Sequence, residues 1–101
     1  TKKILAEIPL RLNQWQETIQ QIRRKSIHAQ EYSNHVQIRL MLELMILEIP
    51  KEITEDIKTQ IIQLDQLLRN LSQPASFVWN IAVDSAFNQD QFWYLFCKLK
   101  N

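Results

Sequence analysis

Apolar residues recur at helical spacing in two long stretches of the chain, stepping by 4, 4, 3, 4 and 3 residues in each. The two stripes are Ile4, Ile8, Leu12, Trp15, Ile19 and Ile22, and Ile53, Ile57, Ile61, Leu64, Leu68 and Leu71. Such spacing is typical of one face of an amphipathic helix. It predicts a first helix from near Pro9 to the high twenties, with residues 2–8 as a helical lead-in and a break or kink at the proline. It also predicts a helix that begins between Pro50 and Thr54 and stops at residues 72–74.

The stretch between these helices, residues 30–49, combines two patterns. Six of its apolar residues alternate with others, as in a strand: Val36, Ile38, Leu40, Leu42, Leu44 and Ile46. Further apolar residues fill the opposite face, however, and Leu, Met, Glu, Gln and Arg favour helix. A lone strand would also lack a partner in this chain. We expect one helix, interrupted if at all at Ser33 or Asn34, and apolar nearly all round, which would make it the most buried helix.

The last quarter of the chain predicts two shorter helices. One covers residues 75–87, after which Asn88 has the position of an N-cap, with Gln91 completing a capping box for a helix that ends near Leu99. The absence of glycine disfavours tight β-hairpins, and short connections at prolines favour antiparallel neighbours. We expect an all-α protein with a single domain over residues 1–101. Its predicted architecture is an antiparallel helical bundle of about four helices with a short aromatic-rich C-terminal helix.

The net charge of +1 hides a division along the chain. Residues 1–41 carry seven basic and three acidic groups, whereas residues 42–68 carry two basic and six acidic groups. This division indicates either ordinary solvated helix faces or a polarised surface that docks an acidic partner at one end.

Three features bear on the location of the protein. Cys97 is the only cysteine, so the chain has no internal disulfide framework, which suits a reducing compartment. The charged N-terminal residues and Pro9 do not have the pattern of a signal peptide. The longest apolar stretch, residues 40–49, contains two glutamates and is shorter than the roughly 20 residues that span a bilayer. We expect a cytoplasmic protein without a transmembrane segment.

Arg23 and His28 have four residues between them. This spacing resembles the catalytic motif of the HEPN family, small all-α proteins that often act as metal-independent RNases, although Arg24 stands where that family usually has a polar residue such as Asn. The resemblance covers residues 23–28. It implies that His28 is the acid or base of RNA cleavage and that Arg23 holds a phosphate. RNA processing or RNA binding through these two residues is therefore one alternative function.

Arg23, Arg24 and Lys25 also form a basic patch at the predicted end of the first helix, where positive charge complements the helix dipole. Lys2, Lys3 and Arg11 add to the basic character of this helix. DNA binding through the first helix is a second alternative function.

His28, Glu31 and His35 are spaced by three and four residues, which places them on one face if a single helix runs through them. Their side chains are of the kinds that bind zinc. The chain offers no second Glu-x-x-His pair of the kind found in di-metal bundles. We expect no cofactor, and these three residues are the alternative metal site.

Aromatic residues are concentrated near the C-terminus, at Phe92, Trp93, Tyr94 and Phe96. Neighbouring residues of a helix lie 100° apart, so these rings cannot all face inward from one helix. Exposed rings are typical of protein interfaces. We therefore expect a non-enzymatic module for protein–protein interaction or self-association, adaptor or regulatory in role. Its predicted interaction surface is these four residues, and its predicted partner is another protein or a second copy of the chain.

Overall fold

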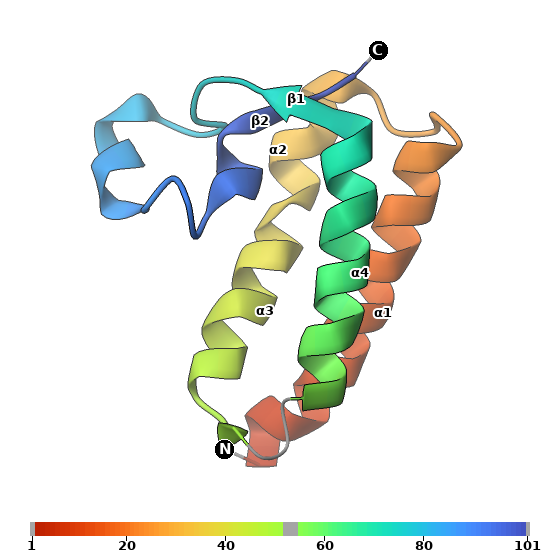
Figure 1. Cartoon of the computed structure of the whole chain (residues 1–101), viewed down its shortest axis with the longest axis vertical. Helices are drawn as coiled ribbons and strands as arrows, with labels where there is room; N and C mark the ends of the chain where they lie inside the picture. The colour runs from red at the N-terminus through yellow and green to blue at the C-terminus, as the bar shows by residue number, and fades with distance from the viewer. Residues whose placement is uncertain (1, 52–54, 101) are drawn as a thin grey trace.

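The computed structural model describes residues 2–51 and 55–100, and within them the chain is mostly helical. Three long segments lie side by side: α1 (Lys2–Arg23) runs up in Figure 1, α2 (Tyr32–His35) and α3 (Gln37–Leu47) run down, and α4 (Glu55–Leu71) runs up again. The 3-10 turn η1 (Ala29–Glu31) precedes α2. Both α3 and α4 pack against α1.

The α1 helix continues through Pro9, so of the predicted break or kink the break is wrong, and the kink stays a prediction. Pro9 is exposed, where its ring meets solvent. The helix stops earlier than predicted, in a Schellman motif. The amide of Lys25 donates to the carbonyl of Ile22 at 3.0 Å, and the amide of Ser26 donates to the carbonyl of Gln21 at 2.9 Å. Lys25 takes the left-handed conformation that the motif requires, with φ of 58°.

Glycine is the usual residue at the left-handed position of this motif, because it has no Cβ. We expect Lys25→Gly to raise the free energy of unfolding by about 0.5–1 kcal/mol, since the relief of strain exceeds the added entropy of the unfolded chain. Urea unfolding followed by circular dichroism measures the change. Lys25→Ala, which keeps the Cβ, should give no such gain, and a loss of stability in Lys25→Gly would contradict the expectation.

The α2 and α3 helices form one interrupted rod. The interruption falls at Val36, two to three residues later than predicted. The expectation that this is the most buried helix is wrong, because residues 30–49 include five buried residues, against six in α1: Tyr32, Val36, Arg39, Leu42 and Ile49. Leu44 and Leu47 of α3 are exposed.

The α4 helix follows its predicted stripe, with Ile61, Leu64 and Leu68 buried. Its predicted start between Pro50 and Thr54 and the stripe member Ile53 fall on residues 52–54, which lie outside the described residues.

Residues 72–100 contain no long helix, so the predicted helices over 75–87 and 88–99 are wrong. The chain instead forms strand β1 (Ser72–Pro74), the 3-10 helices η3 (Ile81–Ala86) and η4 (Trp93–Leu95), and strand β2 (Cys97–Leu99). The two strands pair antiparallel, with Ser72 opposite Leu99 and Pro74 opposite Cys97.

The sequence at the C-terminus explains this difference. Asn88 does cap a turn, because its Oδ1 accepts from the amides of Asp90 and Gln91 at 2.8 and 3.1 Å. The Gln91 side chain, however, donates to Glu43 rather than completing the capping box. Beyond this turn, a strand buries Cys97 and Leu99 and exposes Lys98 between them, whereas a helix would rotate these residues apart.

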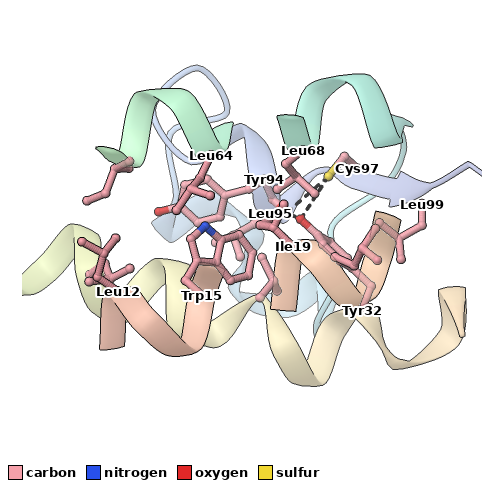
Figure 2. Packing of buried hydrophobic residues seen from close by; sticks show 14 of the residues in the cluster. Leu12, Trp15, Ile19, Tyr32, Leu64, Leu68, Tyr94, Leu95, Cys97 and Leu99 are labelled. Carbon is pink, nitrogen blue, oxygen red and sulfur yellow. Dashed lines mark hydrogen bonds between the residues drawn. The ribbon is translucent and has the colours of Figure 1, made fainter. Parts of the chain in front are cut away.

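One cluster of buried residues draws on α1, α3, α4 and the C-terminal segment. Figure 2 shows Trp15 and Ile19 of α1 close to Leu64 and Leu68 of α4, with Tyr94 and Leu95 between the helices. Among the described residues, no helix is long and apolar enough to cross a membrane.

Candidate functional site

The four aromatic residues predicted to form an interaction surface divide between core and surface. Tyr94 has 0% of its surface exposed, so it is not available as an anchor on the free chain. Phe92, Trp93 and Phe96 are half-buried. Trp93 carries the guanidinium of Arg69 over its face, with Cζ 3.9 Å from the ring centroid. Binding of a partner by these three rings stays a prediction.

Aromatic side chains also hold together a projection of the chain, residues 76–91, that we call the lobe. Phe77 lies at its centre, with the ring centroids of Trp79, Phe87 and Phe96 between 5.2 and 5.9 Å away. The indole of Trp79 donates to the carbonyl of Ser33 at 3.0 Å, which fixes the lobe against α2. In Figure 1 the lobe stands out from the helices beside α2. Much of the aromatic surplus therefore builds this projection.

Tyr94 is held by a buried network around the start of α2. The hydroxyl of Tyr32 donates to the backbone carbonyl of Tyr94 at 2.7 Å and lies 3.3 Å from the sulfur of Cys97 (Figure 2). Burial raises the pKa of Tyr32 far above its ordinary value, and the Cys97 thiol adds to this. Burial also raises the pKa of the Cys97 thiol, which favours its neutral form.

A buried ion cluster joins α3 to α4. Arg39 donates two parallel hydrogen bonds to Asp65, from Nε to Oδ1 and from Nη2 to Oδ2, both 2.9 Å long. Its Nη1 donates to Oε1 of Glu43 at 3.0 Å. Burial alone would lower the pKa of Arg39, but the hydrogen bonds and charge of Asp65 outweigh it and hold the pKa above its ordinary value. Arg39 is therefore a charged group inside the protein.

Tyr94, in the C-terminal segment of the chain, contacts this cluster. Its hydroxyl donates to Oε1 of Glu43 at 3.1 Å, and Cζ of Arg39 lies 4.5 Å from the centre of its ring. Burial raises the pKa of Tyr94, the charge of Arg39 lowers it, and the overall shift is upward. The sequence pattern does not predict this cluster. The local signal for it is an arginine and a glutamate spaced i, i+4 in the most apolar helix.

Below the cluster, α3 and α4 leave an apolar groove between them, with a cavity volume of about 490 Å³. Five aliphatic side chains line it: Ile46, Leu47, Ile49, Ile61 and Ile62. Arg39, Glu43 and Asp65 close one end, and Lys51 and Lys58 complete the lining. Leu47 is 68% exposed and Ile62 is 55% exposed, so the walls of the groove present apolar surface to solvent. A volume of this size is within the range of roughly 300–1,000 Å³ typical of binding pockets.

The two residues of the HEPN-like motif lie close together in the chain, at the end of α1. Arg23 is the last residue of α1, whereas His28 lies in the following loop, and both are exposed. A catalytic or RNA-binding role of this pair stays a prediction.

The basic patch of Arg23, Arg24 and Lys25 is exposed at the end of α1. Arg11, in the middle part of that helix, is paired with Glu7 at 2.9 Å. Lys2 and Lys3 lie at the opposite end of the helix, about 30 Å away by the helical rise. The basic groups of α1 thus do not form one continuous surface.

His28, Glu31 and His35 fall in three different segments: a loop, η1 and α2. Nε2 of His35 lies 3.9 Å from Oε2 of Glu31, and His28 is not part of this pair. In the described part of the chain, no group of three or more His, Cys, Asp or Glu side chains is placed to hold a metal ion. The predicted three-residue set is therefore not assembled.

No protein-family model matches the sequence, and comparisons with curated proteins and with solved structures give no match either.

Proposed function

We propose that this chain is a non-enzymatic protein–protein interaction module, and that the groove between α3 and α4 is the surface that receives an apolar segment of the partner. In this proposal the helices form an antiparallel bundle that is open along one side. The observation that carries the proposal is the groove itself, where five aliphatic side chains line one hollow and two of them remain more than half exposed.

Exposed aliphatic surface is unfavourable in water, by about 25 cal/mol for each Å² that a contact could bury. Contiguous apolar patches on soluble proteins commonly mark interaction sites. The charged end of the groove does not oppose this function, because the carboxylates of Glu43 and Asp65 already accept hydrogen bonds from Arg39. A partner therefore has to desolvate mainly aliphatic side chains.

The experiment that tests this proposal is selection of binders from a display library of amphipathic peptides, followed by mapping of the bound peptide by NMR amide shifts. We expect the shifts to centre on Leu47 and Ile62. Ile62→Glu, which places a charge on the groove wall without emptying the core, should weaken binding by about ten-fold or more.

The matched control is Leu10→Glu, because Leu10 is a similarly exposed leucine on α1 that does not line the groove. It should leave peptide affinity within about two-fold of that of the unchanged chain. Peptides that bind elsewhere, with shifts centred on Trp93 and Phe96, would return the interaction surface to the aromatic segment and overturn the groove proposal.

A further inference from the structure

Exposed apolar surface is concentrated at two places on this molecule. The described residues include seven large apolar side chains that are exposed, and four of them belong to the groove or to the lobe: Leu47, Ile62, Ile81 and Val83. Leu47 and Ile62 line the groove. Ile81 and Val83 belong to η3, in the lobe that stands out from the helices in Figure 1. One patch is therefore a hollow and the other is a projection.

The tip of the lobe is the 3-10 helix η3. Ile81 is 70% exposed and Val83 is 48% exposed, and Ala82 and Ala86 beside them are exposed as well. The side chain of Asn80 caps this helix by accepting from the amide of Ala82 at 3.0 Å. The tip is thus held in one conformation on the packed rings of the lobe, and a preorganised segment loses little conformational entropy when it binds.

The lobe and the groove lining carry net charges of opposite sign. The lobe contains Asp84 and Asp90 and no basic residue, a net charge of −2. The groove lining holds three basic and two acidic residues, a net charge of +1, and the two acids are paired with Arg39. The exposed acids of the same region, such as Glu48, do not line the groove.

The lobe of one molecule is not placed to enter its own groove. Trp79 fixes the lobe at Ser33 of α2, whereas the groove is formed at the far end of α3, around Leu47. These two points are separated by roughly 20 Å of helix. An occupant with the chemistry of the tip must therefore come from another molecule.

We infer that the occupant of the groove is the lobe tip of a second copy of this chain, with Ile81 and Val83 seated between α3 and α4. This inference rests on the function proposed above and names its partner. The contact joins two different surfaces, so it is heterologous, and a pair of copies keeps one free tip and one free groove. Copies add head to tail into a ring or a filament instead of stopping at a symmetric dimer.

The test uses two variants that each destroy one half of the contact. Ile62→Glu disables the groove, and Ile81→Ser combined with Val83→Ser disables the tip; all three residues are substantially exposed, so the fold is retained. Light scattering over a range of concentrations gives the mass of each protein alone and of an equimolar mixture. Leu10→Glu serves as the control that keeps both surfaces.

We expect the unchanged chain and Leu10→Glu to grow beyond a dimer as concentration rises, and each disabled variant to remain a monomer. We expect the mixture to form one-to-one pairs, because the intact tip of one variant enters the intact groove of the other. A mixture that stays monomeric while the unchanged chain associates would indicate a symmetric contact and overturn the inference. An unchanged chain that is monomeric throughout, yet still binds peptides in the groove, overturns self-association and leaves the proposed function standing.

Discussion

Replacing Arg39 by methionine is expected to lower the free energy of unfolding by about 3–5 kcal/mol, because it leaves two carboxylates, of Asp65 and Glu43, in a largely buried position without their cation. Three charge-assisted hydrogen bonds and the contact with the ring of Tyr94 are lost together. Guanidinium unfolding followed by circular dichroism measures the difference. A loss of this size is a large part of the stability of a small domain, about 5–15 kcal/mol.

The double variant Arg39→Met with Asp65→Leu separates the loss of a charge from the loss of packing. Most of the stability should return in it, since replacing a buried ion pair by apolar residues of similar volume is often neutral. A change in the free energy of unfolding of less than about 1 kcal/mol in Arg39→Met alone would contradict the expected loss, because the cluster would then behave as a surface ion pair.

Raising the pH above about 10 is expected to unfold the protein cooperatively. Both tyrosines of the chain, Tyr32 and Tyr94, are buried with raised pKa values. A raised folded-state pKa gives stability that is present below the unfolded pKa and lost as pH rises past it. Two such groups lower the free energy of unfolding by about 2.7 kcal/mol for each pH unit above about 10. The absorbance of tyrosinate should therefore appear together with the loss of helical circular dichroism.

Tyr32→Phe provides the control for this alkaline transition. It removes one ionising group, so the dependence of stability on pH should fall by about half, to roughly 1.4 kcal/mol for each pH unit. Tyrosinate absorbance that develops while the helical signal is intact would show that a tyrosine ionises in the folded protein, and would contradict the burial argument.

The helical part of the fold could be predicted because its signal is local. The steps of three and four residues place Ile8, Trp15 and Ile19 on one face of α1, and all three are buried. The stripe of α4 likewise places Ile61 and Leu68 on one face of that helix, and both are buried. A long amphipathic pattern needs only one apolar surface to pack against, whatever that surface is.

The C-terminal segment could not be predicted in this way. Its backbone hydrogen bonds go to distant partners: the amide of Val78 donates to the carbonyl of Leu95, and the amide of Lys100 donates to the carbonyl of Leu71. Local propensity and the cap at Asn88 favoured a helix. Tertiary pairing overrode that preference, as it commonly does for short segments.

The candidate site also depends on contacts between residues that are distant in the sequence. Arg39 and Asp65 are 26 residues apart, and the groove beside them is lined by residues of both α3 and α4. Residues 40–47 are apolar nearly all round the predicted helix, and this pattern predicts that they lie in the core. The structure places Leu44 and Leu47 in solvent, because the core is already filled by side chains of α1 and the C-terminal segment.

The pairing of β1 with β2 closes the chain around the lobe, because Pro74, which precedes the lobe, lies opposite Cys97, which follows it. Because this pairing holds the base of the lobe, the structural effect of a substitution at the tip is expected to stay within the tip. Ile81 and Val83 touch solvent, so their replacement is not constrained by the packing of the helices. Substitutions at these positions are therefore expected to leave the scaffold intact, and foreign peptides grafted between residues 81 and 86 are expected to need no redesign of the core.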